Sequence, residues 1–176
     1  IVALTFGFIL DPANGLLNSF LRSIDLGFLE GQWLVNDSTA LNSVIAVDVW
    51  KGLGYIMTIL FAALVSIPSH YFEAAQIDGA SYWQRVRFIT IPMMMPTITI
   101  TVVLNVLYGL RVFDIIMVLT KGGPGHATDV VNLVIFNNMG YGYYGLGAAL
   151  SSLMFVVCIL VGYFIMKVLN REEVAI

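Results

Sequence analysis

The chain has 176 residues, of which 59% are hydrophobic and 11% are charged, and its formal net charge is −3. A soluble domain carries about 25% charged residues, so this chain has too few to cover the surface of an ordinary cytosolic enzyme or to remain disordered. The weak negative charge excludes the basic surface of a nucleic-acid-binding protein, and the composition indicates a protein partly surrounded by lipid.

The chain begins with an apolar segment, residues 1–10, that is shorter than the roughly 20 residues of a spanning helix. We interpret it as the outer half of a transmembrane helix and expect further residues upstream. Turn-forming residues follow at 11–15, and apolar residues then recur at helical spacing from Leu16 to Ile24. This spacing predicts a short amphipathic helix at the membrane surface, and Trp33 beyond it is a candidate interface anchor.

Three longer apolar segments predict complete membrane-spanning helices at residues 41–67, 88–112 and 146–167. Pro68 ends the first segment, and Pro92 and Pro96 are expected to bend the beginning of the second. The long connection at 113–145 is rich in glycine and tyrosine and either contacts an extracytoplasmic partner or is a flexible connector. Basic residues number four on each side, and their higher density around 69–87 only weakly favours a cytoplasmic position for that loop.

The loop at residues 69–87 has signals for two short helices. Ser69 is a candidate cap for the first, and Gly79 can adopt the left-handed conformation that ends it. Ser81 and Gln84 have the spacing of a capping box for the second helix. The loop also carries large apolar side chains, which are Tyr71, Phe72, Ile77, Tyr82 and Trp83. We therefore expect this protrusion to be buried against a protein partner.

The same loop carries a longer motif, which consists of Glu73-Ala74-Ala75, then Gly79, then Ile89-Thr90-Ile91-Pro92. This spacing resembles the EAA motif of binding-protein-dependent ABC importer permeases, E-A-A-x3-G-x9-I-x-L-P, with Ile91 in place of the usual leucine. Phe113-Asp114 and the run from Leu119 to Pro124 resemble the maltose/oligosaccharide branch, and the similarity extends over residues 11–173.

The resemblance implies an all-α membrane protein of the ABC type I importer permease kind, in which residues 1–176 form one transmembrane domain. Residues 69–87 would be the cytoplasmic coupling loop, residues 113–145 would be extracytoplasmic, and a cytoplasmic tail would follow residue 167. The coupling residues implied are Glu73, Ala74, Ala75, Asp78, Gly79 and Pro92.

The resemblance also implies the partners and the location of the protein. The partners would be a second, homologous permease subunit, two cytoplasmic ATPase subunits and an extracytoplasmic solute-binding protein, assembled in a bacterial or archaeal cytoplasmic membrane. The sequence has no G-x-x-x-x-G-K-[ST] motif, so ATP and Mg²⁺ are expected on the ATPase subunits. We expect no cofactor, metal ligand or catalytic residue on this chain, which would be a transport subunit and not an enzyme.

Polar groups inside spanning segments are the candidates for substrate binding, because they are costly to place in lipid. On the segment at 41–67, Asp48, Lys51 and Tyr55 share a face. The full candidate set, on two helices expected to face each other around a sugar, is Asp48, Trp50, Lys51, Gly52, Tyr55, Asn105, Tyr108, Gly109, Arg111 and Val112. Aromatic rings stack on sugars and polar groups bind their hydroxyls.

Each of these residues also has a purely structural interpretation. Asp48 with Lys51, and Arg111 with Asp114, have the spacing of local ion pairs. Asn105 could form an interhelical hydrogen bond, Tyr108 could simply pack, and Trp50 could anchor at the interface.

The favoured function is import of a sugar or oligosaccharide, with glycerol phosphate or a polyol as an alternative solute. A secondary transporter or channel that works without ATP is a further alternative. It would require an ion-coupling cluster within the membrane, and only Asp48 and Arg111 approach one.

Overall fold

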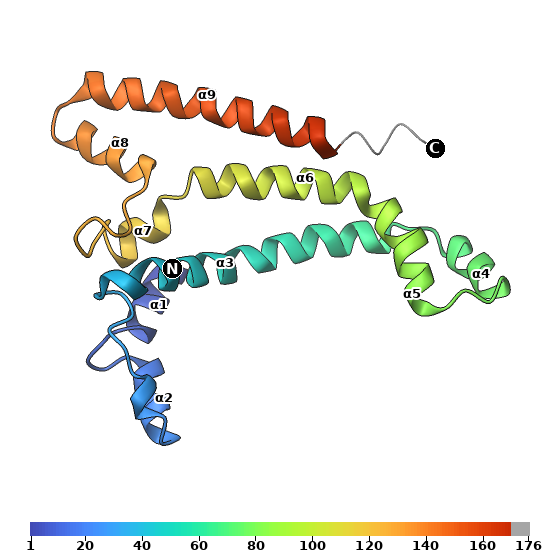
Figure 1. Ribbon diagram of the computed structural model, residues 1–176, viewed down its shortest axis with the longest axis horizontal. Helices are drawn as coiled ribbons and strands as arrows, with labels where there is room; N and C mark the ends of the chain where they lie inside the picture. Colours follow the sequence, from blue (N-terminus) through green and yellow to red (C-terminus); the bar gives the residue numbers. More distant parts are fainter. Residues whose placement is uncertain (170–176) are drawn as a thin grey trace. The chain divides into compact units, whose positions relative to one another are not determined.

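A computed structural model describes residues 1–169, so the predicted tail with Arg171 lies outside the described residues. Over this range the chain consists of helices and connections without strands, as predicted (Figure 1). The elements are α1 (Val2–Ile9), α2 (Leu16–Ser23), η1 (Gly27–Leu29), α3 (Asp37–Val65), α4 (Ser69–Ile77), α5 (Tyr82–Arg85), η2 (Val86–Thr90), α6 (Ile91–Leu110), α7 (Asp114–Leu119), α8 (Val131–Gly140) and α9 (Tyr144–Leu169).

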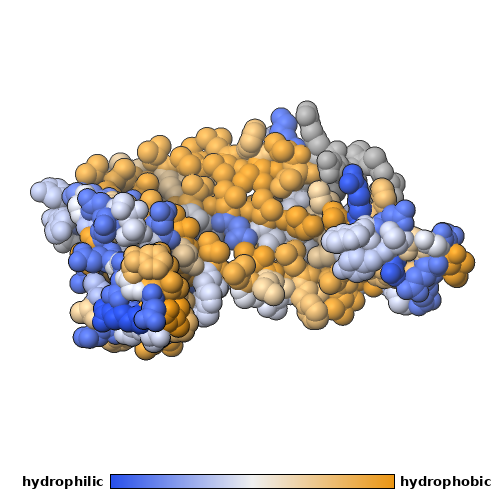
Figure 2. Space-filling view, turned by 60° about the horizontal axis from the view of Figure 1, so that its bottom comes forward, coloured by the Kyte–Doolittle hydropathy of each residue, from blue (hydrophilic) through white to orange (hydrophobic). Residues whose placement is uncertain are grey.

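Three helical segments in the described part of the chain are long and apolar enough to cross a membrane. They are Asp37–Val65, Tyr82–Leu119 and Tyr144–Leu169, and each overlaps one of the three predicted spans with different ends. Figure 2 shows apolar residues over most of the long helices, with hydrophilic residues gathered at both ends of the view. Large apolar side chains such as Phe61, Phe155 and Phe164 are about two-thirds exposed. Lipid or protein must cover such a surface.

The chain divides into two compact units. Unit 1 contains residues 1–52 and 110–157, and the described part of unit 2 contains residues 53–109 and 158–169. The boundaries fall within α3 and α9 and before the last residue of α6, so each of these helices contributes to both units.

Unit 1 has a small apolar core, built mainly from α1, α3 and α7. Val44 and Val47 of α3 and Ile115 and Ile116 of α7 are almost fully buried, together with Leu133 of α8. Helix α1 packs on α7, so the two lie side by side (Figure 1). The eight-residue α1 is therefore held by its neighbours, since an isolated helix of that length is unstable in water.

A buried asparagine attaches α2 to the segment that follows it. The Asn18 side chain is 3% exposed. Its Nδ2 donates to the carbonyls of Pro12 and Gly31 at 3.3 and 3.1 Å, and its Oδ1 accepts the N–H of Gly31 at 3.4 Å and the indole N–H of Trp33 at 2.9 Å. Asn18 is thus turned inward together with the half-buried Leu17 and Leu21. The exposed side of the helix carries apolar residues, including Leu16, Phe20 and Ile24.

An ion pair adds to this attachment. Arg22 Nε donates to Glu30 Oε1 at 2.8 Å. This hydrogen bond holds the pKa of the Glu30 carboxyl below its usual value.

The segment at 113–145 is not the loop that the sequence predicted. It contains α7 and α8, joined by a compact turn at residues 120–130. In this turn the Thr120 hydroxyl lies 2.7 Å from the Thr128 hydroxyl, which donates to the Gly123 carbonyl at 2.7 Å. Thr128 is fully buried, so the glycine-rich stretch is an ordered, internally bonded structure and not a flexible connector.

Unit 2 carries the two short helices and the inner part of the second span. The N–H of Ile91 bonds to the carbonyl of Val86, five residues back, which makes η2 a π-helical turn between α5 and α6. Pro92 follows directly and cannot donate a backbone hydrogen bond, and Pro96 lies inside α6. The irregularity at the beginning of this helix therefore has a local cause in the prolines. The predicted bend itself stays a prediction. Farther along, a Cβ on Gly162 would lie 3.7 Å from Leu107, so α9 approaches α6 closely there.

Candidate functional site

The predicted coupling loop ends its first helix with a complete Schellman motif. Gly79 has φ +73°, its N–H bonds to the Gln76 carbonyl at 3.0 Å, and the N–H of Ala80 bonds to the Ala75 carbonyl at 2.9 Å. In this motif the left-handed residue follows the third-last helical residue by four positions. The spacing of Ala75 and Gly79 in the E-A-A-x3-G pattern is therefore the spacing that stops the helix.

The second short helix begins with the predicted capping box. The Gln84 side chain accepts the N–H of Ser81 at 2.7 Å, and the Ser81 hydroxyl accepts the N–H of Gln84 at 3.4 Å. Two N–H groups at the start of α5 are satisfied in this way. The chain direction is thus fixed on both sides of Gly79.

One capping prediction for this loop is wrong. Ser69 is the first residue of α4, and the extended residue before it, Pro68, takes the cap position without a side-chain hydrogen bond. Pro68 has a fixed φ, and its backbone carbonyl accepts the N–H of Tyr71 at 3.3 Å, so the first turn of α4 forms without a serine cap.

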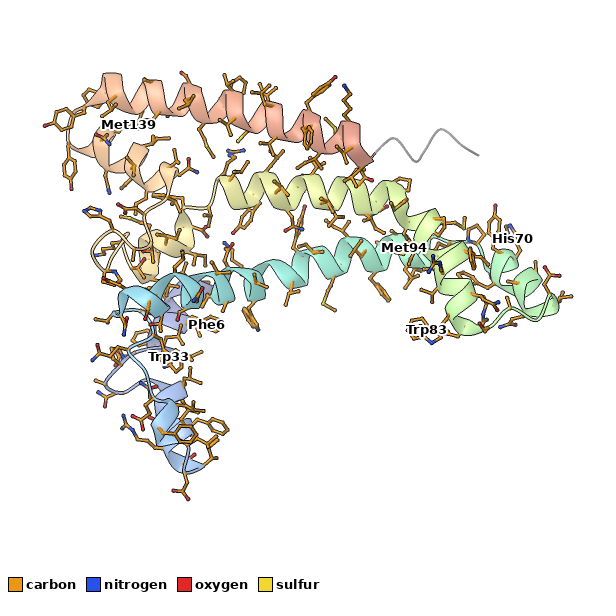
Figure 3. All side chains as sticks on the ribbon, viewed as in Figure 1. Phe6, Trp33, His70, Trp83, Met94 and Met139 are labelled. Atoms are coloured by element: carbon orange, nitrogen blue, oxygen red, sulfur yellow. The ribbon has the colours of Figure 1, made fainter. Side chains whose placement is uncertain are left out.

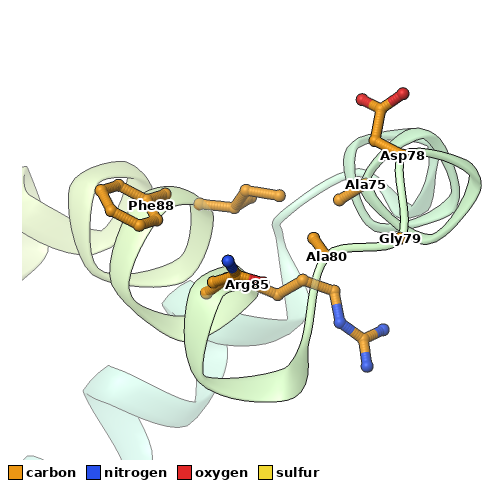
Figure 4. A pocket seen from close by; sticks show the side chains of 8 residues that line it. Ala75, Asp78, Gly79, Ala80, Arg85 and Phe88 are labelled. Carbon is orange, nitrogen blue, oxygen red and sulfur yellow. The ribbon is translucent and has the colours of Figure 1, made fainter.

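Three of the six predicted coupling residues, Ala75, Asp78 and Gly79, line a shallow cavity of about 330 Å³ in unit 2 (Figure 4). Its lining consists of Ala75, Asp78, Gly79, Ala80, Gln84, Arg85, Phe88 and Ile89. Glu73 and Ala74 are exposed but do not line it, and Pro92 is exposed farther along the chain in α6. The structure therefore brings Ala75, Asp78 and Gly79 together at one hollow and leaves Glu73 on the open surface.

The two short helices around this hollow expose large apolar side chains. Ile77 is 88% and Trp83 is 76% exposed, and Phe88, which lines the hollow, is similarly open. Figure 3 shows Trp83 on α5, pointing away from α4. Arg85 lines the hollow as well, and its Nε is buried without a hydrogen-bond partner among the described residues. A partner with apolar groups would complement the exposed side chains.

The candidate substrate residues are divided between the two units. Asp48, Trp50, Lys51, Gly52, Arg111 and Val112 belong to unit 1, and Tyr55, Asn105, Tyr108 and Gly109 belong to unit 2. The predicted pocket between two facing helices stays a prediction.

In unit 1 the ion pair formed by Lys51 is a long-range one. Lys51 Nζ lies 2.5 Å from Asp114 Oδ2, which joins α3 to the first residue of α7. The sequence had offered Arg111 as the local partner of Asp114, and this pairing with Lys51 replaces it. The backbone carbonyl of Arg111 accepts the Asn132 amide at 2.7 Å instead, so this connection between α6 and α7 is bound to α8.

In unit 2 the candidate residues are mostly open. Tyr55 and Tyr108 are exposed, and no atom would lie within 4 Å of a Cβ on Gly109. The Asn105 amide donates to the Thr101 carbonyl of its own helix at 3.2 Å. The interhelical hydrogen bond considered for Asn105 is therefore replaced by a bond within α6.

Sequence reasoning missed a larger cavity in unit 1, of about 540 Å³. Its lining includes Phe6, Trp33, Thr39, Asn42, Ser43 and Trp50. Phe6 and Trp50 meet edge to face with ring centroids 5.1 Å apart. Residues two apart on a helix point in nearly opposite directions, so Trp50 lies on the side of α3 away from Asp48. The contacts of Phe6 and Trp33 depend on the chain path, and periodicity alone did not indicate them.

Comparisons with known proteins agree with these features. The family described as binding-protein-dependent transport system inner membrane component matches residues 1–173. The chain is 41% identical over 157 residues to the trehalose/maltose transport system permease protein MalF of Thermococcus litoralis, and the aligned region covers 89% of this chain and 52% of that protein. It is 34% identical over 173 residues to the probable ABC transporter permease protein YurN of Bacillus subtilis, and the aligned region covers 95% of this chain and 58% of that protein. The chain thus spans somewhat over half the length of these relatives.

Similarity to a solved structure extends to the fold. A crystal structure of a bacterial ABC transporter involved in the import of the acidic polysaccharide alginate matches with a TM-score of 0.85 and 28% identity, covering 97% of this chain and 60% of that one. The chain therefore belongs to the family of binding-protein-dependent transport system inner membrane components.

Proposed function

We propose that this chain is part of the transmembrane permease subunit of an ATP-driven ABC importer for a sugar or oligosaccharide. The observation that carries the proposal is the loop of α4 and α5, in which one helix is stopped, the next is capped, and large apolar side chains are exposed. Family membership and the relative named for trehalose and maltose transport support the solute class.

In this proposal α4 and α5 form a coupling element on the cytoplasmic side. Ala74 and Ala75 are small, so a partner can approach the helix backbone closely, and Glu73 offers a charge to a basic group. Ile77 and Trp83 would enter a groove of the ATPase subunit, and their burial there would remove apolar surface from water. Closure of two ATPase subunits would move this element and change access to the solute path.

The proposed assembly contains a second permease subunit, two ATPase subunits and an extracytoplasmic solute-binding protein. A similar alginate transporter is described in complex with a periplasmic protein that carries an alginate pentasaccharide, which supports a binding protein for this chain as well. The chain would cross a bacterial or archaeal cytoplasmic membrane several times, with 69–87 inside and 113–145 outside. ATP and Mg²⁺ would bind to the ATPase subunits, and this chain would have no catalytic role of its own.

The ten candidate substrate residues would lie along the path of the sugar. Asp48, Lys51 and Asn105 offer polar groups for hydroxyls, and Tyr55 and Tyr108 offer rings for the sugar faces.

The test is uptake of labelled maltose or trehalose by proteoliposomes that contain the complete importer and its binding protein. Replacement of Glu73 or Gly79 should lower uptake and uncouple it from ATP hydrolysis. Wild-type coupling in both variants would contradict the proposal.

A polyol or related osmolyte is a second candidate solute. The chain is 38% identical over 146 residues to the osmoprotective compounds uptake permease protein GgtC of Synechocystis, covering 82% of this chain and 51% of that one. Calorimetric titration of the partner solute-binding protein with maltose, trehalose and simple polyols would distinguish the two solute classes.

A further inference from the structure

We propose that Asp114 is a specificity-determining residue that neutralises Lys51 and so restricts the importer to uncharged sugars. The inference rests on the proposed function, because it concerns the solute that passes the candidate residues of unit 1. The inference adds the charge of the substrate to that function. The evidence for it is the geometry of one ion pair.

The pair joins elements that are distant in the sequence. Lys51 Nζ on α3 and Asp114 Oδ2 on α7 are 2.5 Å apart, and the two residues are separated by 63 positions. Asp114 is the first residue of α7, where a negative charge is favoured by the helix dipole. The carboxylate is therefore stabilised from two sides, and it is well placed to hold the ammonium group.

Both groups remain accessible to a solute. The Lys51 side chain is 31% exposed and the Asp114 side chain is 62% exposed. A sugar hydroxyl can hydrogen-bond to either group without breaking the pair, since an ammonium has three N–H donors and a carboxylate has about four lone-pair sites. A uronate carboxylate would instead compete with Asp114 for Lys51, and the negative charge of Asp114 would repel it.

The other charged candidates of unit 1 are Asp48 and Arg111. Asp48 and Arg111 carry one charge of each sign, as do Asp114 and Lys51, so the four residues have a formal sum of zero. A path with no net charge suits a neutral sugar, whereas an anionic sugar needs an excess of positive charge for binding. The similar transporter for the acidic polysaccharide alginate makes this distinction relevant to the present chain.

The alternative is that the ion pair only braces α3 against α7. A brace would affect stability and would weaken all sugars alike when removed. A specificity device would instead change the ratio of affinities for charged and neutral sugars. The two roles can therefore be distinguished by the ratio of the affinities for charged and neutral sugars, which a general loss of structure does not change.

The test compares two sugars that differ by one carboxylate. Maltose and the disaccharide in which glucuronic acid replaces its non-reducing glucose are titrated against the purified complete importer in detergent, with saturation-transfer NMR to measure weak binding. The variants are Asp114→Asn, which keeps the shape and removes the charge, and the double variant Lys51→Gln/Asp114→Asn. Asp129→Asn is the matched control, because Asp129 is another acid of unit 1 but it bonds to His126.

We expect wild type to prefer maltose, and D114N to raise the ratio of acidic to neutral affinity about tenfold, which corresponds to about 1.4 kcal/mol. The gain should shrink in high salt and disappear in the double variant, and D129N should keep the wild-type ratio. An unchanged ratio in D114N, or a wild-type preference for the acidic disaccharide, would overturn the inference and leave sugar import standing. Failure of wild type and variants to bind either sugar would count against the proposed function itself.

Discussion

The side chains of Ser81 and Gln84 bond reciprocally to each other's backbone N–H, at 3.4 and 2.7 Å. This capping box starts α5 only two residues after Gly79 has ended α4. The turn between the two short helices is therefore specified twice, once by a glycine conformation and once by side-chain caps. A loop that transmits movement needs this kind of rigidity, because a flexible connection would absorb the displacement.

Replacement of Gly79 by alanine should distort this turn. The residue has φ +73°, and a left-handed conformation costs an alanine about 1–2 kcal/mol. No atom lies within 4 Å of the added Cβ, so the penalty would come from the backbone and not from a clash. Uptake by the reconstituted importer should fall, whereas Gly79→Asn should retain more activity because asparagine tolerates this conformation. Equal loss in both variants would argue against the conformational explanation.

Removal of the capping box should loosen α5 without unfolding the protein. Ser81→Ala should cost about 1 kcal/mol, and Ser81→Thr, which keeps the hydroxyl, should cost less. Hydrogen exchange at the N–H groups of Ser81 and Gln84 measures the effect, because these groups lose their acceptors. Unchanged exchange at both positions in the alanine variant would show that the box does not stabilise the helix.

Replacement of Asn18 by leucine should destabilise unit 1. The variant leaves the Trp33 indole N–H and the Gly31 backbone groups without their partner, at about 1–3 kcal/mol for each buried group left unsatisfied. Thermal unfolding in detergent and Trp33 fluorescence would report the loss. In a Trp33→Phe background the same replacement should cost less, because that N–H is already absent. Equal costs in the two backgrounds would mean that the 2.9 Å bond contributes nothing.

The glycine-rich turn before α8 provides a contrast between two glycines. A Cβ on Gly122 would overlap the Asp129 carboxylate and lie 2.9 Å from Leu133, and this residue also has φ +91°. Gly122→Ala should therefore destabilise unit 1 by about 3 kcal/mol, from strain and overpacking together. A Cβ on Gly125 would be 3.9 Å from the nearest atom, so Gly125→Ala should cost about 1 kcal/mol from φ alone. Thermal unfolding of the two variants would contradict this account if Gly125→Ala were the less stable.

Local signals in the sequence predicted much of this structure. The three long apolar segments, the stop at Gly79 and the box at Ser81 and Gln84 each depend on residues close together in the chain. Their physical causes are local, namely hydrophobic length, backbone conformation and capping. The misplaced cap at Ser69 is a one-residue error, because Pro68 begins the helix without a side-chain bond.

The features that the sequence did not predict depend on distant residues or on short helices. The pairing of Lys51 with Asp114 spans 63 positions, and the bonds from Asn18 to Gly31 and Trp33 depend on the path of the intervening chain. Helix α7 has six residues, too few for a recognisable hydrophobic period, and the glycines after it favoured the interpretation as a loop. Tertiary contacts, which leave no periodic pattern, decided these elements.

Site-specific photo-crosslinking tests the coupling role of α4 and α5 most directly. A photoreactive amino acid at Ile77, which is 88% exposed, is compared with the same amino acid at Tyr141, which is 76% exposed at the end of α8. In the intact importer the Ile77 variant should form a covalent adduct with the ATPase subunit, whose yield changes when ATP is added, and the Tyr141 variant should form none. An ATPase adduct at Tyr141, or none at Ile77, would contradict the assignment of this loop as the coupling element.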